Sequence, residues 1–426
     1  MSKAETDDDR SYAVTTDFPV PFLKRVKIRN YKSIVSCDVE LGALTVLVGR
    51  NGAGKSNFLD ALRFVADAMR KSLAEAIKSR GSINEVCSRR EENPKGFEIE
   101  LEVEISSHSR ANYGFGVRTK GVYGFEVEWE RFEIGIKDAI YFTFDRSFSR
   151  ISIEDHKNQV AIVPLVFSSD SLFFNKYNAS KFSALTATRI FLDGTCFYDF
   201  NVPMMKEPRT YDAGEILQNN GANIASVFGR IERERPEVKN RIIEYLSAIV
   251  PGVTDIKRMS LGPYETLEFT QQESGSDSPA VFYPLNMSDG TLRAFGALVA
   301  VAQLAEGNVP VSLVGIEEPE AALHPAAAGA LMDALHEAAV HTQIVVTTHS
   351  PDLLDRLDFE TDRILVVESR NGETRIGPID NASRKAIKEH LFSPGELLRM
   401  DQLEIDWTDL ERQRQSKSAE AAGESS

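Results

Sequence analysis

The chain has 426 residues, of which 42% are hydrophobic and 27% are charged, a composition that fits a globular protein and excludes collagen-like, coiled-coil-only and wholly disordered classes. Its formal net charge is −15 at pH 7, so any contact with nucleic acid would need a local basic patch. The chain has 3 cysteines and no CxxC pair, which argues against a disulfide framework or a structural zinc.

Residues 1–20 include a run of aspartates from Asp7 to Asp9 and lack the basic and apolar blocks of a signal peptide. We predict a disordered tail there. The longest apolar stretch, residues 294–305, is shorter than the about 18 residues that a membrane-spanning helix needs. We therefore expect a cytoplasmic protein that makes no membrane contact of its own.

The first chemical motif lies between an apolar strand at residues 44–48 and a helix with apolar residues at helical spacing. The loop between them matches the complete P-loop pattern, in which glycines let main-chain N–H groups surround phosphate oxygens; a chance glycine-rich turn would lack these flanking elements. Lys55 would reach the β and γ phosphates and Ser56 would bind Mg²⁺, so ATP and Mg²⁺ are the predicted cofactors. The predicted nucleotide-binding residues here are Gly49, Asn51, Gly52, Gly54, Lys55, Ser56 and Asn57.

Two inserted segments follow this motif. Residues 96–170 alternate at period two and are rich in β-branched and aromatic side chains, which predicts an antiparallel β-rich lobe. Residues 171–285 have apolar side chains at helical spacing, which predicts a mainly helical lobe that leads to the next motif. The α/β alternation of the remaining chain predicts one core around a parallel sheet, formed by residues 21–95 and 286–400, with a C-terminal extension and tail at 401–426.

The sequence from Met287 to Thr291 stands directly before an apolar helix. Ser288 and Gly290 would expose a hydroxyl group and main-chain N–H groups at the N-terminus of that helix, which makes a second anion site on the chain. One nucleotide does not need two such sites. From these residues alone, an ordinary helix cap is the simpler interpretation.

Two further strands end in reactive side chains. Glu317 and Glu318 follow an apolar run, and in a parallel sheet they would lie at the same edge as the P-loop. We predict that Glu317 binds Mg²⁺ and that Glu318 is the catalytic base that activates water. His349 ends the next strand, where it would contact the γ-phosphate as a second catalytic residue. Taken alone, it would be interpreted as an ordinary histidine.

In this order, the P-loop, the Ser288 motif, the paired glutamates and His349 resemble the Walker A, signature, Walker B and switch-histidine motifs of ABC-type ATPases. Residues 28–33, 49–57, 288–290 and 317–325 resemble the RecF/SMC-like branch in particular, including the ATPase parts of OLD-family nucleases. The resemblance implies an α/β fold, namely an ABC-type P-loop ATPase head with an inserted antiparallel β lobe and a helical lobe. The chain departs from the family where Glu317 replaces the usual Walker B aspartate and His324 replaces the usual D-loop aspartate.

The resemblance also implies that two heads hold two ATP molecules between them, with Ser288 of one subunit completing the site built on Lys55 of the other. ATP would then hold a homodimer or a higher homo-oligomer together, and hydrolysis would open it.

The expected function is a Mg-dependent ATPase that controls DNA engagement or a separate effector in bacterial DNA repair or anti-phage defence. OLD nucleases carry a Toprim domain after the ATPase, and the about 75 residues after His349 leave no room for one. We therefore expect a separate effector protein, such as a Toprim-like nuclease or a toxin.

Two other functions stay open at this point. The chain could be a scaffold or sensor that holds an effector with little turnover, although the intact Lys55 and Glu318 favour hydrolysis. It could be the ATPase subunit of a transporter, although the long insertion between Lys55 and Ser288 argues against that class. DNA is an open partner as well. The basic groups at residues 24–29 and 230–235 either line a DNA path or form solvated charged faces, and their alternation with other residues favours the second interpretation.

Overall fold

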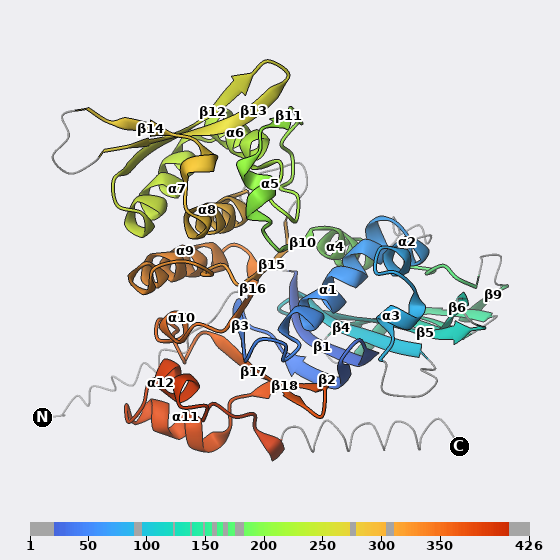
Figure 1. Cartoon of the computed structure of the whole chain (residues 1–426). Helices are drawn as coiled ribbons and strands as arrows, with labels where there is room; N and C mark the ends of the chain where they lie inside the picture. Colours follow the sequence, from blue (N-terminus) through green and yellow to red (C-terminus); the bar gives the residue numbers. More distant parts are fainter. Residues whose placement is uncertain are drawn as a thin grey trace, which may run out of the picture.

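The computed structural model describes residues 21–88, 96–121, 124–136, 139–147, 150–155, 160–164, 169–174, 183–272, 278–303 and 311–408. The predicted tail at residues 1–20 lies outside the described residues, and so do residues 409–426 of the predicted C-terminal extension. The described part is a mixed α/β structure in which one large sheet runs through the molecule between helices (Figure 1). The predicted fold class is confirmed.

One end of the large sheet is a set of parallel strands that carry the apolar runs of the sequence. Their order is β10 (Thr195–Tyr198), β15 (Leu313–Glu317), β16 (Gln343–Thr348), β3 (Leu44–Val48) and β17 (Arg363–Arg370). Parallel strands are buried on both faces, which explains why these runs are continuous rather than alternating. Strand β3 pairs with β16, so segments before and after the inserted residues belong to one sheet.

Alternate residues of these strands enter two separate hydrophobic cores. Val46 and Val48 belong to a core shared with helices α8 (Asp289–Ala302) and α9 (Ala328–Ala339). Leu47 belongs to a core shared with helix α1 (Lys55–Arg70). Because successive side chains of a strand point to opposite faces, the sheet separates the helix after the P-loop from the helix after the Ser288 motif.

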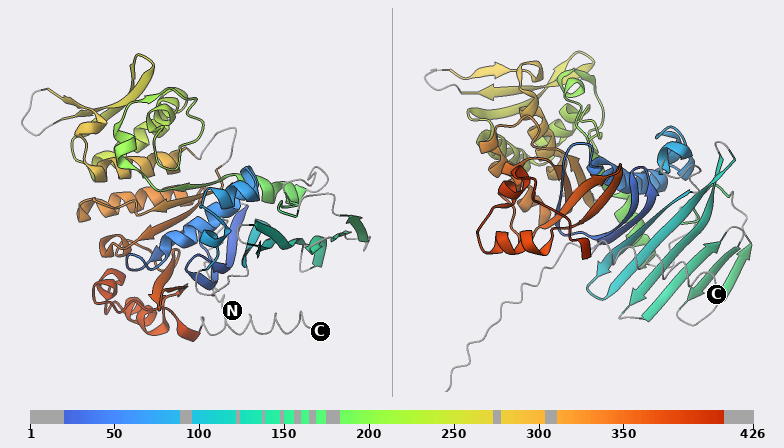
Figure 2. Two further views of the ribbon diagram at one scale, coloured as in Figure 1. Left: turned by 45° about the vertical axis from the view of Figure 1, so that its right-hand side comes forward. Right: turned by 60° about the horizontal axis from the view of Figure 1, so that its bottom comes forward.

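The β-rich segment extends the same sheet rather than forming a separate one. Beyond β17 the strand order is β18 (Glu373–Pro378), β2 (Ile34–Glu40), β1 (Phe22–Tyr31), β4 (Gly96–Ser106), β5 (Ser109–Lys120), β6 (Gly124–Ile136), β7 (Ala139–Ser147), β8 (Arg150–Asp155) and β9 (Val160–Pro164). Strand β4 pairs antiparallel with β1, and Figure 2 shows the following strands as a broad extension to one side. The sequence predicts these strands but not the junction, because the local pattern of a strand does not name its neighbour.

The lobe before the Ser288 motif lies at the opposite side of the molecule (Figure 2). Its helices are α6 (Ile224–Glu234) and α7 (Pro236–Ile249), and its small sheet contains β11 (Arg209–Thr210), β12 (Val253–Leu261), β13 (Tyr264–Gln271) and β14 (Ala280–Phe282). Strand β10 comes from the same stretch of sequence but pairs with β15 in the large sheet. The range 171–285, which we expected to be mainly helical, therefore contributes strands to both sheets.

The remaining helices are short or lie at the edges of the molecule. They are α2 (Leu73–Lys78), α3 (Ile83–Val86), α4 (Ser183–Asp193), α5 (Val202–Lys206), α10 (Pro351–Leu354), α11 (Asn381–Lys388) and α12 (Pro394–Arg399), with 3-10 turns at Pro284–Asn286 and Pro325–Ala327. Within the described ranges, no helix is long and apolar enough to cross a membrane.

A buried carboxylate fixes the β-rich extension to the chain that follows it. Glu130 and Arg146 are both fully buried, and 3.5 Å separates Arg146 Nη1 from the nearer oxygen of the Glu130 carboxylate. Glu130 also accepts hydrogen bonds from the main-chain N–H groups of Phe173 (2.6 Å) and Phe174 (2.9 Å) and from the Tyr113 hydroxyl (3.1 Å). The carboxylate therefore joins strands β5, β6 and β7 to residues 173 and 174.

We expect Glu130→Ala to lower the free energy of unfolding of this region by about 3–5 kcal/mol, because Arg146 and two main-chain N–H groups lose their buried acceptor. Urea unfolding followed by the fluorescence of Trp129, which precedes Glu130 in the chain, measures the loss in a Trp407→Phe background that removes the second of the 2 tryptophans. The control is Asp145→Ala, which removes a solvent-exposed ion pair with Arg131 and should cost less than about 1 kcal/mol. Equal losses in the two variants would contradict this assignment.

Candidate functional site

The P-loop joins β3 to α1 through a tight turn that requires glycine. Gly52 and Gly54 have φ angles of +77° and +108°, a conformation that strains any residue with a Cβ atom. At Gly49, an added Cβ would lie 2.1 Å from the main-chain oxygen of Val367 in β17. The first turn of α1 contains no acidic side chain, so its free N–H groups and the positive end of the helix dipole are available to an anion.

Lys55 is almost completely buried at the start of α1. Its Nζ donates to the main-chain oxygens of Gly49 (2.7 Å) and Arg50 (3.2 Å) and lies 3.9 Å from Glu318 Oε1. Burial lowers the pKa of Lys55, and the negative charges of Glu318 and Glu320 oppose this shift. Because a phosphate is a stronger partner than a carbonyl oxygen, the lysine is positioned to exchange these main-chain contacts for an anionic ligand.

The sequence did not predict that polar side chains form a hydrogen-bonded row behind the P-loop. Asn57 Nδ2 donates to Ser33 Oγ (2.6 Å), and Ser33 Oγ lies 2.6 Å from Thr374 Oγ1. Thr374 Oγ1 also donates to the main-chain oxygen of Ala53 (2.8 Å), and an added Cβ at Gly54 would lie 2.0 Å from it. Asn57, which we predicted to bind nucleotide, therefore belongs to a hydrogen-bonded row that supports the loop from behind.

The predicted magnesium ligands come together. Glu317 is the last residue of β15, and the Ser56 hydroxyl donates a hydrogen bond to its carboxylate. Burial raises the pKa of Glu317; the hydrogen bond from Ser56 lowers it, and the negative charges of Asp199 and Glu318 raise it further. Asp199, which follows β10, is a nearby carboxylate that the sequence did not single out.

The predicted base and the predicted switch histidine are in direct contact. Glu318 has a φ angle of +42°, which few non-glycine residues adopt, and its main-chain N–H is held by the main-chain oxygen of Thr347 (3.1 Å). In this position Glu318 Oε1 lies 3.2 Å from His349 Nδ1. The two side chains are 33% and 45% exposed, so water and substrate can reach both.

The turn after the two glutamates holds a third carboxylate. Glu320 is buried, accepts a hydrogen bond from the Thr348 hydroxyl, and has one carboxylate oxygen without a partner among the described residues. Burial raises the pKa of Glu320. The Glu320–Thr348 bond ties this turn to the strand that carries His349. Farther along the turn, His324 Nδ1 accepts a hydrogen bond from the Ala326 N–H (3.2 Å), so this departure from the family pattern serves as a local cap.

The predicted signature residues stay apart from this group. Ser288 caps α8, and its Oγ lies 3.1 Å from the main-chain nitrogen of Thr291 and 2.7 Å from the Thr291 hydroxyl. An added Cβ at Gly290 would lie 2.2 Å from the main-chain oxygen of Ala322. No hydrogen bond or ion pair within the described ranges links Ser288 to Lys55, and Figure 1 shows α8 packed beside α7, away from α1.

The P-loop, the glutamates and His349 meet because three neighbouring parallel strands end at one edge. In the strand register, Glu317 is opposite Thr347, and Thr348 is opposite Val48, the residue before the P-loop. Among the described residues, no group of three or more His, Cys, Asp or Glu side chains could hold a metal by itself. Ser56 and Glu317 therefore offer a partial metal site of the kind that Mg²⁺ completes with phosphates and water.

A family model described as “AAA domain, putative AbiEii toxin, Type IV TA system” matches residues 44–190 and 212–355, which is more than half of the chain. The chain belongs to this family. The matched residues of this AAA domain include the P-loop, both glutamates and His349. The sequence-based assignment to the ABC-type, RecF/SMC-like ATPases related to OLD is confirmed.

The AAA domain is also similar to curated and solved proteins. The OLD nuclease of Thermus scotoductus (strain ATCC 700910 / SA-01) is 24% identical over 394 residues, which are 86% of this chain and 66% of that protein. The chain thus spans less than two thirds of the length of that relative. An SMC head bound to the C-winged helix domain of ScpA aligns with a TM-score of 0.53 at 16% identity, covering 85% of this chain and 100% of that one.

A second SMC head, with an extended coiled coil and bound to the C-terminal domain of ScpA derived from Pyrococcus furiosus, aligns with a TM-score of 0.50 at 14% identity. The alignment covers 87% of this chain and 99% of that one. At such identities the likeness concerns the fold alone. It confirms that this AAA domain has the fold of an ABC-type ATPase head.

Thr374→Val tests the row behind the P-loop. The substitution keeps the shape of the side chain but leaves the buried carbonyl of Ala53 without its donor, so we expect the free energy of unfolding to fall by about 1–3 kcal/mol. Thr254→Val is the matched control, because its hydroxyl bonds a main-chain oxygen at an exposed position and should cost less than about 0.5 kcal/mol. Thermal or urea unfolding measures both, and a neutral Thr374→Val would contradict the role of the row.

Proposed function

We propose that this ATPase binds ATP and Mg²⁺ and hydrolyses ATP in a sandwich of two copies of the chain, which controls a separate effector or the engagement of DNA. One observation carries the proposal. Lys55, Ser56, Glu317, Glu318 and His349 meet at one edge of the sheet, as in-line phosphoryl transfer to water requires. Ser288, the remaining anion-binding hydroxyl, lies elsewhere in the same chain.

The residues fit a magnesium ion. Ser56 and Glu317 place a hydroxyl and a carboxylate oxygen in contact, and the charges of Asp199 and Glu318 add to a negative potential that a divalent cation would relieve. When bound, Mg²⁺ would neutralise charge on the β and γ phosphates. In our proposal, Ser56 and Glu317 would hold the ion together with phosphate oxygens and water.

The roles of the other residues follow from their positions. Lys55 exchanges its contacts with the Gly49 and Arg50 carbonyls for the phosphates. Glu318 orients the attacking water and accepts its proton. His349, 3.2 Å from Glu318, orients that carboxylate and contacts the γ-phosphate. Glu318 is therefore the residue whose loss should stop turnover without preventing binding.

The second copy supplies the missing anion contact. In a symmetric pair, the face that carries the N-terminus of α8 would lie against the P-loop of the partner, so that Ser288 and the Gly290 N–H meet the γ-phosphate from the other side. Gly290 supports this role, because an added Cβ would displace the Ala322 turn that follows the Walker B strand. ATP would then act as part of the interface, and hydrolysis would release the copies.

The effector is proposed from the relatives. The similar protein from Thermus scotoductus is an OLD nuclease, and the matching family is described with an AbiEii toxin. We propose that the nucleotide state of this chain governs a separate protein of that kind, a Toprim-like nuclease or a toxin, in DNA repair or anti-phage defence. A scaffold with little turnover would become the better proposal if phosphate release stayed at background levels with every effector and DNA tested.

Direct DNA binding receives less support, because acidic side chains pair with several of the basic groups at residues 24–29 and 230–235. Arg25 lies 2.6 Å from Asp38, and Arg29 lies 3.2 Å from Glu98. In α6, Arg230 lies 2.8 Å from Glu234. Acidic partners reduce the attraction of these groups for phosphate, so the effector is the partner that we favour.

Glu318→Gln tests the hydrolytic site. We expect ATP binding to be retained and phosphate release to fall by about 100-fold or more, because the amide cannot accept the proton of the attacking water. Lys55→Ala should abolish ATP binding itself, which separates the two roles. Equilibrium binding of ATP and a steady-state phosphate assay measure both variants. Wild-type turnover in Glu318→Gln would contradict the assignment of the base.

Ser288→Arg tests the contact in trans. We expect the isolated variant to bind ATP as the wild type does and to lose hydrolysis, because the larger side chain blocks the sandwich rather than the P-loop. Ser260→Arg is the control, since Ser260 is an exposed serine near the end of β12, in the lobe that precedes the Ser288 motif. Normal turnover in Ser288→Arg would exclude the sandwich.

A further inference from the structure

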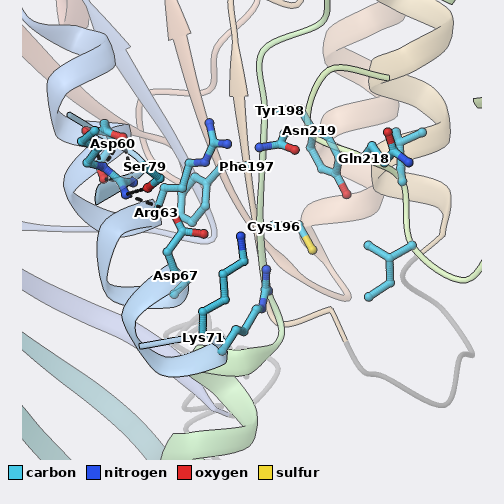
Figure 3. Close-up of a pocket in the computed structure, with 15 residues that line it drawn as sticks. Asp60, Arg63, Asp67, Lys71, Ser79, Cys196, Phe197, Tyr198, Gln218 and Asn219 are labelled. Atoms are coloured by element: carbon cyan, nitrogen blue, oxygen red, sulfur yellow. Dashed lines mark hydrogen bonds and ion pairs between the residues drawn. The ribbon is translucent and has the colours of Figure 1, made fainter. Parts of the chain in front are cut away.

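A cavity apart from the P-loop opens beside the C-terminal half of α1 (Figure 3). Its volume of about 430 Å³ falls in the range of small-molecule sites. Helix α1 forms one wall, and strand β10 with residues 216–219 forms the other. The cavity therefore lies between the helix that follows the P-loop and the strand next to the Walker B strand.

Positive charge in this cavity is not neutralised by the protein residues described. Arg80 is paired with Asp60 (2.9 Å) and Asp67 (3.1 Å), and Lys32 is also paired with Asp60 (2.5 Å), so these two cations balance the two carboxylates. Arg63 and Lys71 also line the cavity, and no carboxylate among the described residues pairs with either. Arg63 is half-buried, and a guanidinium in such a place without an acidic partner is a strong site for an anion.

Arg70 connects the two walls of the cavity by hydrogen bonds. Arg70 Nε donates to the main-chain oxygen of Asp193 (2.8 Å), and its Nη2 donates to the main-chain oxygen of Thr195. These bonds fasten the end of α1 to the start of β10. The two walls are thus fixed relative to each other, and the side chains of Arg63 and Lys71 remain available to a ligand.

The opposite wall offers an aromatic ring and amide groups. The Phe197 ring is partly exposed in the cavity and packs against Gly315, where an added Cβ would lie 2.4 Å from the ring. The side chains of Gln218 and Asn219 are exposed, and they have no partner among the described residues. Figure 3 shows Lys71 reaching from the helix towards this wall. The cavity therefore combines cations on one side with a flat apolar surface and hydrogen-bonding amides on the other.

We propose that this cavity is a second nucleotide-binding site, separate from the P-loop, for a ligand with two phosphate groups. Arg63 lies on α1 and Lys71 directly follows the helix, eight positions farther along the chain, which is about 12 Å at the rise of a helix, a span that their long side chains reduce. They would bind the phosphates, while Phe197 would stack on a base whose polar edge faces Gln218 and Asn219. Either a free nucleotide or the 5′ end of a strand carries this chemistry.

The test uses Lys55→Ala as the background, so that the P-loop does not contribute and failure of the proposed ATPase mechanism does not affect the result. The probes are ADP and the 5′-phosphorylated dinucleotide pTpT, each measured by isothermal titration calorimetry. We expect at least one probe to bind, and Arg63→Glu to weaken that binding by about tenfold or more. Binding of ADP alone assigns a free nucleotide, and binding of pTpT alone assigns a strand end.

Matched variants keep the result specific. Lys78→Glu makes a similar charge change on α2, at an exposed lysine outside the cavity, and should change the dissociation constant less than about twofold. Lys71→Glu is the second cavity variant, for the case that Arg63→Glu does not fold, and should weaken binding as Arg63→Glu does. The proposal is overturned if neither probe binds more tightly than about 1 mM, or if Lys78→Glu reduces binding as much as the cavity variants do.

Discussion

The register of three parallel strands decides where every reactive group of this ATPase lies. Strands β15, β16 and β3 are neighbours, and their carboxyl ends are level to within one or two residues. Glu317 ends β15, His349 follows β16 and the P-loop follows β3, so the sheet places Lys55 within 3.9 Å of Glu318, a residue 263 positions farther along the chain. Continuous apolar burial of the strands on both faces fixes this register, because a shift by one residue would exchange the two cores.

Polar contacts then adjust the loops at that edge. Thr374 reaches from β18 to the P-loop, and Glu320 connects the Walker B turn to Thr348 in the next strand. Glu318, in the Walker B turn, has a φ angle of +42°, in the left-handed region. This backbone conformation costs a non-glycine residue roughly 1–3 kcal/mol of free energy, which the surrounding hydrogen bonds must offset. The strained residue is the one to which we assign the chemistry.

The motifs could be located from the sequence alone, because each is made of residues that are neighbours in the chain. The P-loop glycines, the glutamates and His349 follow apolar runs directly, so strand ends could be predicted from local pattern. The contact between Ser33 and Thr374 spans 341 positions and uses two common residue types, so no local pattern marks it. The pairing of β1 with β4 and the place of β10 in the large sheet were missed for the same reason.

The sequence alone also could not decide whether Ser288 caps a helix or binds a nucleotide. In the structure Ser288 caps α8, while the resemblance to ABC-type ATPases assigns the same hydroxyl to a nucleotide held by another copy. The two roles are compatible, because a capped helix N-terminus still presents free N–H groups. If Ser288 only caps α8, one subunit can complete its ATP site with its own residues. If Ser288 also binds nucleotide, that site needs the Ser288 of a second subunit.

Mixing two inactive variants tests this most directly. Lys55→Ala has no functional P-loop but an intact Ser288, and Ser288→Arg has the reverse. Each mixed pair has one complete site. In a mixture of equal amounts we therefore predict that phosphate release recovers to between about a quarter of the wild-type rate, if the variants pair at random, and about half of it, if only mixed pairs form. No recovery above the separate variants, at concentrations where the wild type pairs, would contradict a site shared between two copies.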